Sequence, residues 1–213
     1  MNEMRANSWN QLQDWLFEDA WDMQIGRFRS RYAFRGISNI AYPLETTLIR
    51  LGGNYVTLER HLLRAFRKYA HRSVVKRDSI WEWLSVAQHY GLPTRLMDWT
   101  YSPFVALHFA TENQQALDTD GAVWMVDLWE AQQELPPRLL QVLKDVNSFS
   151  SDAEMLDGHI ESVADLQTFP DQRTSDGFLL FFEPPSIDDR IVNQYALFSI
   201  LSDPLAVLDT WLA

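Results

Sequence analysis

The segment Gln88–Ala110 reads QHYGLPTRLMDWTYSPFVALHFA and combines many polar groups with the start of an apolar helix. Gly91 and Pro93 end a preceding helix, "TRLMDW" predicts a strand, and Ser102 followed by Pro103 predicts the start of the next helix. The polar groups gather at the ends of these elements and are Gln88, His89, Thr94, Arg95, Asp98 and Thr100. This concentration predicts either one wall of a binding pocket or a polar network that joins strand to helix.

The composition indicates one globular domain without covalent cross-links. A chain of 213 residues that is 46% hydrophobic and 13% aromatic can bury a large core, which argues against disorder. The sequence has no Cys, which excludes disulfides, thiolate metal sites and a cysteine nucleophile and suits a reducing compartment. No apolar run has the length of a membrane span and the N-terminus lacks a signal-peptide core, so we expect a cytoplasmic protein without membrane contact.

Charge is distributed unevenly along the chain. The formal net charge is -11, yet residues 27–77 hold twelve Lys/Arg and two acids, a local net of +10, which leaves -21 on the rest. A basic segment in an acidic chain predicts an anion-binding surface, and the helix side within 60–77 is the candidate contact for a nucleic acid or a protein acceptor. The alternative is that the basic third pairs internally with the acidic two-thirds.

Hydrophobic periodicity predicts an α+β fold: a single domain with a small mixed or antiparallel sheet flanked by helices. We expect an N-terminal helical extension over 1–26, the main domain over 27–202 and a C-terminal helix over 203–213. Helices are expected over 9–23, 57–72, 79–90, 102–111 and 186–194, with Ser8, Ser79, Ser102, Ser186 and Asp203 as N-caps. Strands are expected at "RYAFRGIS", "TRLMDW", "GAVWMVDL", "DGFLLFFE" and "YALFSIL". The stretch 135–166 is expected to be helical or mixed.

The common catalytic and metal motifs are missing from the sequence. The five histidines have no zinc-binding spacing, and neither a glycine-rich phosphate loop nor a GxSxG elbow occurs, so no metal site is expected. His108 is expected to be a core histidine. His89 ends a helix, where a functional and a structural role are equally compatible with the pattern. Asp98 interrupts an apolar strand and needs a partner, for which Arg35, Arg95 or backbone amides are candidates.

Two motifs resemble the FRG domain, a family named for a Phe-Arg-Gly tripeptide. The first is "YAFRGISN", with the tripeptide at Phe34-Arg35-Gly36, and the second runs from Gln88 to Pro103. A third element, Arg190, Gln194 and Phe198 in "RIVNQYALF", is similar to the C-terminal signature of the family. The resemblance covers about 27–202 and implies no firmly assigned activity.

A more distant resemblance is to ADP-ribosyltransferases of the arginine–serine–glutamate class. Phe34-Arg35-Gly36 is similar to their first element, and Asp98–Ser102 with "SPFVALHFA" is similar to the second, but Asn193-Gln194 stands where their Glu is expected. The resemblance implies NAD as a substrate, with Arg35 on the pyrophosphate and Thr100 and Ser102 on the nicotinamide ribose. The implied NAD-binding set is Arg35, Gly36, Gln88, Thr94, Arg95, Thr100 and Ser102. The implied catalytic set is His89, Asp98, Glu183 and Gln194, in which Asp98 or Glu183 supplies the missing carboxylate.

Three hypotheses follow. The first is an enzyme, an ADP-ribosyltransferase-like protein or NAD glycohydrolase that acts as a toxin or phage-defence effector, and the titratable groups His89, Arg95 and Asp98 favour it. The second is a non-catalytic module that binds a nucleotide or nucleic acid in the same pocket, which the missing Glu favours. The third is a buried structural network. Both functional hypotheses require Arg35, His89 and Asp98 to share one cleft.

Overall fold

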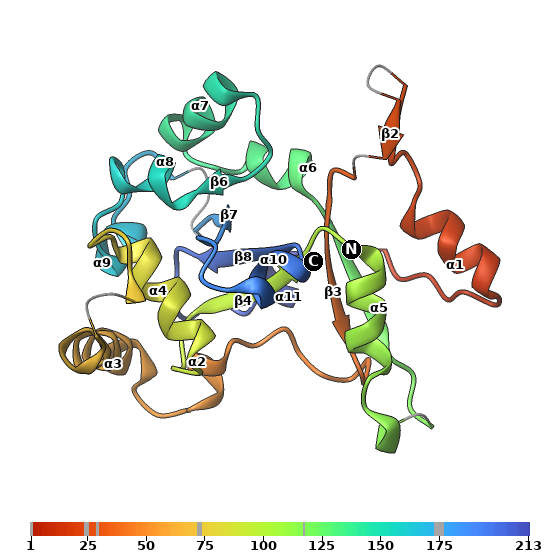
Figure 1. Ribbon diagram of the computed structural model, residues 1–213, viewed down its shortest axis with the longest axis horizontal. Helices are drawn as coiled ribbons and strands as arrows, with labels where there is room; N and C mark the ends of the chain where they lie inside the picture. Colours follow the sequence, from red (N-terminus) through yellow and green to blue (C-terminus); the bar gives the residue numbers. More distant parts are fainter. Residues whose placement is uncertain (1, 24–25, 29, 72–73, 117, 173–176) are drawn as a thin grey trace.

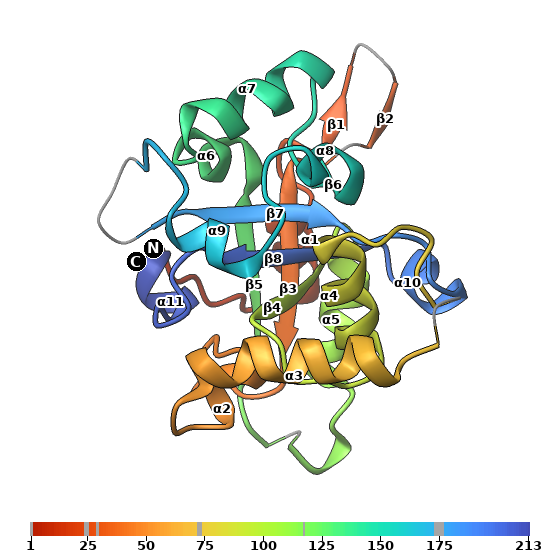
Figure 2. The same cartoon turned by 90° about the vertical axis from the view of Figure 1, so that its left-hand side faces the viewer.

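A six-stranded mixed sheet forms the centre of the molecule, which confirms the α+β prediction. The computed structural model describes residues 2–213 except 24–25, 29, 72–73, 117 and 173–176. The strands of the sheet are β3 (Tyr32–Ile37), β4 (Leu96–Thr100), β5 (Ala122–Asp127), β6 (Ser151–Asp152), β7 (Leu179–Glu183) and β8 (Ala196–Leu201). Their order is β5-β3-β4-β8-β7-β6, and the neighbours are antiparallel except β6 and β7, which are parallel. Figure 2 shows β3 and β5 running steeply across β7 and β8.

The larger core covers one face of β4, β7 and β8. Its helices are α3 (Tyr55–Tyr69), α4 (Ile80–His89), α7 (Pro137–Val146), α8 (Ala153–Asp157) and α9 (Val163–Gln167). Trp81 of α4 is fully buried against Phe182 of β7, with ring centroids 5.0 Å apart. α4 begins as predicted, because Ser79 accepts a hydrogen bond from the backbone N–H of Glu82. Burial of this aromatic-rich face is the main source of stability for the fold.

The opposite face of the sheet packs against two short helices. These are α6 (Leu128–Gln133) and α11 (Leu208–Trp211). Their buried residues Leu128 and Leu208 share a cluster with Trp99 and Phe181 of the sheet. Leu44 joins the same cluster from the segment that leads to α2 (Thr47–Arg50). The sheet is therefore covered by apolar groups on both faces.

Helix α5 (Pro103–Thr111) packs directly on β3 (Figure 1). The approach is so close that a Cβ on Gly36 would lie 1.8 Å from the carbonyl oxygen of Ala106. Only glycine allows this packing, so the Gly of the Phe-Arg-Gly tripeptide serves helix–strand contact. Phe34 and Ala106 form a third apolar cluster with Leu16 of α1 (Trp9–Leu16).

Several predicted boundaries need correction. The N-terminal helix ends at Leu16 instead of continuing to 23, since Asp19 has φ 54 and the chain then forms the hairpin β1 (Trp21–Asp22) and β2 (Arg27–Phe28). The N-cap of α10 (Asp189–Asn193) is formed by Asp188 and not by Ser186, because Asp188 Oδ1 accepts from the N–H of Ile191. Asp203 is not the N-cap of the last helix. Its Oδ1 accepts a hydrogen bond from the N–H of Leu205, whereas α11 starts at Leu208 with Val207 at the N-cap. A short 3-10 helix, η2 (Gln114–Ala116), follows α5.

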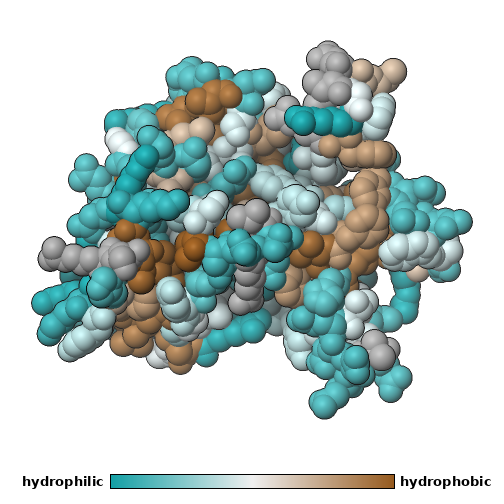
Figure 3. Space-filling view, in the orientation of Figure 1, coloured by the Kyte–Doolittle hydropathy of each residue, from teal (hydrophilic) through white to brown (hydrophobic). Residues whose placement is uncertain are grey.

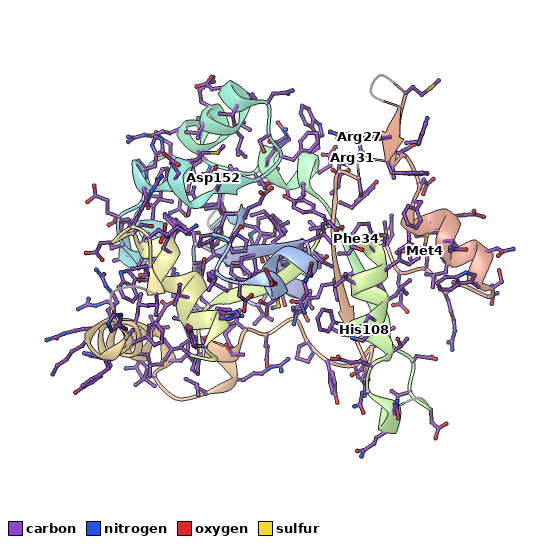
Figure 4. The ribbon with its side chains drawn as sticks, viewed as in Figure 1. Met4, Arg27, Arg31, Phe34, His108 and Asp152 are labelled. Carbon is purple, nitrogen blue, oxygen red and sulfur yellow. The ribbon has the colours of Figure 1, made fainter. Side chains whose placement is uncertain are left out.

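The basic third of the chain does not form one continuous surface. Arg27 and Arg31 lie beside the β1–β2 hairpin, at the opposite end of the molecule from α3 (Figures 2 and 4). Arg31 pairs with Asp127 at 2.9 Å, so part of the basic segment is neutralised internally. Arg60, Arg64, Arg67 and Lys68 of α3 are exposed, and Arg67 also pairs with Asp78 at 2.6 Å. No helix among the described residues is long and apolar enough to cross a membrane.

Candidate functional site

A cavity of about 500 Å³ opens between α4 and α5. Strands β3, β4 and β8 contribute to its walls, and residues from α2, α10 and the segment 38–44 complete them. Its volume falls within the range of cofactor and small-molecule sites. Arg35, His89 and Asp98 all line it, so the predicted shared cleft is confirmed.

The cavity exists because two neighbouring strands diverge. Within the described chain, Phe34 and Thr100 form the one paired position that joins β3 to β4. Beyond it β3 continues along β5 to Ile37, while β4 continues along β8 back to Leu96. Consecutive residues of both strands therefore face the gap. Their polar groups, Arg35 of β3 with Asp98 and Thr100 of β4, line the cavity.

Arg35 supplies a half-buried positive charge to the cavity. Its Nη1 donates a hydrogen bond to the backbone carbonyl oxygen of Asp98 at 2.5 Å. Its Nε is buried and has no hydrogen-bond partner among the described residues. Burial lowers the pKa of the Arg35 guanidinium, and the nearby charge of Asp98 only partly opposes that effect. An arginine held this way retains donor capacity for an anionic ligand.

Asp98 presents its carboxylate to the cavity in a fixed orientation. Gln88 Nε2 donates to Asp98 Oδ2 at 3.0 Å, and Gln88 Oε1 accepts from Thr94 Oγ1 at 2.6 Å. Thr94 is buried and its backbone N–H bonds Thr47 Oγ1 of α2 at 3.2 Å. Gln88 of α4 thus links the carboxylate of Asp98 to Thr94 in the loop before β4. Asp98 itself remains exposed. Catalytic and ligand-binding carboxylates are typically held in one orientation by such neighbouring hydrogen bonds.

His89 connects two walls of the cavity. Its Nε2 lies 3.0 Å from Asp188 Oδ2, and Asp188 also caps α10. Ile191 and Gln194, from α10 and the residue after it, line the cavity beside His89. His89 therefore holds the segment around α10 against the C-terminus of α4, whatever chemical role its ring also has.

Thr100 and Gln194 meet at the narrow end of the gap between the strands. Thr100 Oγ1 donates to the backbone oxygen of Gln194 at 2.7 Å and accepts from the N–H of Ser102 at 3.0 Å. Both Thr100 and Gln194 line the cavity. The hydroxyl of Thr100 is consequently committed to backbone contacts that hold β4 against the start of β8.

The cavity lining leaves out four residues of the predicted site, which are Thr94, Arg95, Ser102 and Glu183. Thr94 acts through its hydrogen bond to Gln88. Arg95 forms a buried bidentate ion pair with Glu59 of α3 and donates to the carbonyl oxygen of Ser202 at 3.2 Å. Ser102 caps α5 by accepting from the N–H of Val105. Glu183 lies on the other face of the sheet, because it follows Phe182, which pairs with Phe198 and shares the face of Asp98.

The surroundings of Glu183 confirm that separation. Its Oε1 accepts from Tyr101 Oη at 3.0 Å and from Ser150 Oγ at 3.3 Å. Of the two carboxylates considered for the missing Glu, only Asp98 reaches the cavity. His108 also differs from expectation, since its side chain is 69% exposed and lies 3.7 Å from Glu112. The helix α5 uses Ala106, not His108, to face β3.

Sequence reasoning did not single out Arg50, Tyr42 or Glu112, which also line the cavity. Arg50 is the one basic residue between Arg35 and Arg60 in the sequence. That isolated positive charge could have marked it as a candidate site residue. The side chain of Arg190, part of the third resemblance element, lies outside the described residues.

Comparisons with known proteins give one match. Neither the curated proteins nor the solved structures include a significantly similar chain. The matched family segment is shorter than the 27–202 range that the motifs suggested. Residues 30–119, which carry Arg35, His89 and Asp98, match the family model described as the FRG domain, and this match supports the FRG assignment of that part of the chain.

Proposed function

We propose that the cavity binds NAD and that the protein cleaves the bond between nicotinamide and ribose, as an ADP-ribosyltransferase-like enzyme or NAD glycohydrolase. The observation that carries this proposal is the placement of the half-buried Arg35 guanidinium and the exposed Asp98 carboxylate in one cavity of about 500 Å³. NAD carries complementary charges, an anionic diphosphate and a cationic nicotinamide ring. An enzyme of this kind acts as a toxin or phage-defence effector when it depletes cellular NAD.

Arg35 and Asp98 have distinct roles in this reaction. Arg35 donates charge-assisted hydrogen bonds to the diphosphate. Asp98 lies toward C1′ of the ribose, where positive charge develops as the glycosidic bond breaks, so it stabilises the transition state more than the bound substrate. Gln88 keeps the carboxylate in position through its bond to Asp98 Oδ2.

Hydrolysis breaks one bond to C1′ of the ribose and forms another. The C1′–N bond breaks with its electron pair moving to nicotinamide, which leaves as a neutral molecule. The oxygen of a water forms a new bond to C1′ and loses one proton to Asp98, which passes it to solvent. The products are ADP-ribose, nicotinamide and a proton, and in transfer a nucleophile of the acceptor replaces water.

The test substitutes two carboxylates, Asp98 and Glu183, and measures turnover of NAD separately from nucleotide affinity. Asp98→Asn is expected to lower turnover of NAD by about 10²–10³-fold and to change nucleotide affinity only a few-fold, because it removes charge stabilisation of the transition state. Glu183→Gln is the matched control, since Glu183 lies on the opposite face of the sheet, and its turnover should equal that of the wild type. Equal turnover in Asp98→Asn and the wild type would contradict the role of Asp98.

A non-catalytic nucleotide-binding module is the second candidate. The observation that favours it is Gln194, which lines the cavity. This neutral residue stands in the sequence where the resemblance to the transferases leads us to expect Glu. Tight binding of NAD without release of nicotinamide would select this candidate.

The exposed side of α3 is the proposed contact for a nucleic acid or a protein acceptor. Figure 3 shows hydrophilic residues over α3, and Figure 4 shows its nitrogen-tipped side chains pointing away from the body. The acid on this helix, Glu59, is buried in its pair with Arg95, so the solvent side is basic. Tyr69, which is 79% exposed beside Lys68, adds an aromatic surface suited to base stacking.

A further inference from the structure

Two guanidinium groups from separate elements line the cavity. Arg35 comes from β3 and is half-buried with its Nε enclosed, whereas Arg50 comes from the last turn of α2 and is exposed. The cavity therefore has one arginine at its inner wall and one at its rim. The anionic side chains that line it are Asp98 and Glu112.

Neither acid forms an ion pair with either arginine. Asp98 meets Arg35 through its backbone oxygen, while its carboxylate accepts from Gln88. Glu112 lies beside His108 at 3.7 Å on α5. Among the described residues, no salt bridge joins Arg35 or Arg50 to an acid. Both guanidinium groups thus keep hydrogen-bond donors for a ligand.

The two positive charges affect each other. Burial is the main cause that lowers the pKa of the Arg35 guanidinium. The charge of Asp98 partly opposes that effect, and the charge of Arg50, the smallest of the three causes, lowers the pKa further. Like charges around one cavity repel, and an anion placed between them offsets both the repulsion and the burial of Arg35. The buried Nε of Arg35 has no hydrogen-bond partner among the described residues, so it can donate to an acceptor of a bound anion.

We propose that Arg35 and Arg50 together bind the two phosphates of a nucleoside diphosphate, so that the site selects diphosphate-containing nucleotides over monophosphates. This inference rests on the proposed nucleotide site and adds its selectivity. Arg35 takes the phosphate at the inner wall and Arg50 takes the phosphate at the rim. A guanidinium offers paired N–H donors in a plane that matches phosphate oxygens, which a lysine does not reproduce.

The selectivity has a simple consequence for affinity. Adenosine engages neither arginine, AMP engages one at a time, and ADP engages both. A single charge-assisted contact corresponds to about a tenfold change in the dissociation constant. ADP and ADP-ribose should therefore bind about tenfold or more tightly than AMP, and AMP more tightly than adenosine.

The experiment titrates adenosine, AMP, ADP and ADP-ribose into the full chain by calorimetry, with Arg50→Gln, Arg50→Lys and Arg60→Gln as variants. Arg50→Gln should bring the ADP/AMP affinity ratio close to one and leave AMP affinity within about twofold of the wild type. Arg50→Lys should restore only part of the ratio, because it keeps the charge without the planar fork. Arg60→Gln removes an exposed arginine of α3 that does not line the cavity and should leave the ratio unchanged.

The outcomes separate this inference from the proposed reaction. The diphosphate clamp is overturned by equal wild-type affinities for AMP and ADP, by an unchanged ratio in Arg50→Gln, or by binding of none of the four nucleotides. Selective ADP binding without release of nicotinamide from NAD supports the clamp and contradicts catalysis. Since Arg50 is exposed, both of its variants should melt at the wild-type temperature. If Arg50→Gln melts lower and Arg50→Lys does not, the affinity ratio of Arg50→Lys decides the test.

Discussion

Arg35 Nη1 donates a 2.5 Å hydrogen bond to the backbone carbonyl oxygen of Asp98. Strand alternation alone would separate the two side chains, because Phe34 pairs with Thr100 and therefore Asp98 shares the face of Phe34, not of Arg35. They meet in one cavity because β3 and β4 diverge beyond that pair. The divergence converts two strand ends into a site that holds a cation and a carboxylate together.

The first prediction concerns the stability cost of Arg35. Because its folded pKa is lowered, the charged form is less favourable in the folded chain than in the unfolded chain at every pH below that pKa. Arg35→Met should then melt at or above the wild-type temperature at neutral pH while nucleotide binding is lost. Differential scanning calorimetry and nucleotide titration measure both properties. If Arg35 instead belongs to a purely structural network, this variant melts lower.

The second prediction concerns Gly36. Gly36→Ala places a methyl group against the backbone of Ala106 and should destabilise the protein by at least about 2 kcal/mol in chemical denaturation. Gly158→Ala is the matched control, because Gly158 has φ -80 and no atom within 4 Å of the added Cβ. Equal stability of the two variants would show that α5 does not require this close approach.

The third prediction concerns the buried pair of Arg95 and Glu59. Glu59→Gln leaves the Arg95 guanidinium buried without its counter-charge and should cost about 3 kcal/mol of unfolding free energy. Replacing both residues, as Glu59→Leu with Arg95→Met, should recover most of that loss because no charge remains buried. Urea denaturation measures both variants. A double variant that is as unstable as Glu59→Gln, or less stable, is the contrary result.

The fourth prediction concerns the basic side of α3. Arg60, Arg64 and Lys68 follow one another by four residues, a rise of about 6 Å per step. If single-stranded nucleic acid binds there, neutralising all three to Gln should reduce the slope of log affinity against log salt by about 2. A triple variant of Arg27, Arg138 and Lys144, exposed cations away from α3, carries the same charge change. Equal slopes for both triple variants would exclude α3 as the contact.

Local patterns predicted much of the fold and part of the site. The alternation in "YAFRGI" predicted β3, and the Ser102-Pro103 pair predicted the start of α5, because both signals arise from neighbouring residues. The grouping of Gln88, His89 and Thr100 around one cavity also followed from their places at element ends, whereas Asp98 lies in the middle of β4. These residues needed no information about distant pairing.

The remaining residues depended on tertiary contacts that local sequence does not contain. Arg95 and Arg35 carry identical chemistry, and only packing of α3 decides that Glu59 neutralises Arg95 and leaves Arg35 for the cavity. The face of Glu183 depends on the register of β7 with β8, which a shift of one residue would reverse. Arg50 reaches the cavity through the position of α2, set by the contact of Leu48 with the backbone of Thr94.

Release of free nicotinamide from NAD tests the central claim most directly. The purified chain is incubated with NAD, and nicotinamide is quantified over time by chromatography beside Asp98→Asn and Glu183→Gln. The account predicts release by the wild type and by Glu183→Gln at the same rate, with about 10²–10³-fold less from Asp98→Asn. No release by the wild type, under conditions in which calorimetry shows NAD bound, would contradict it.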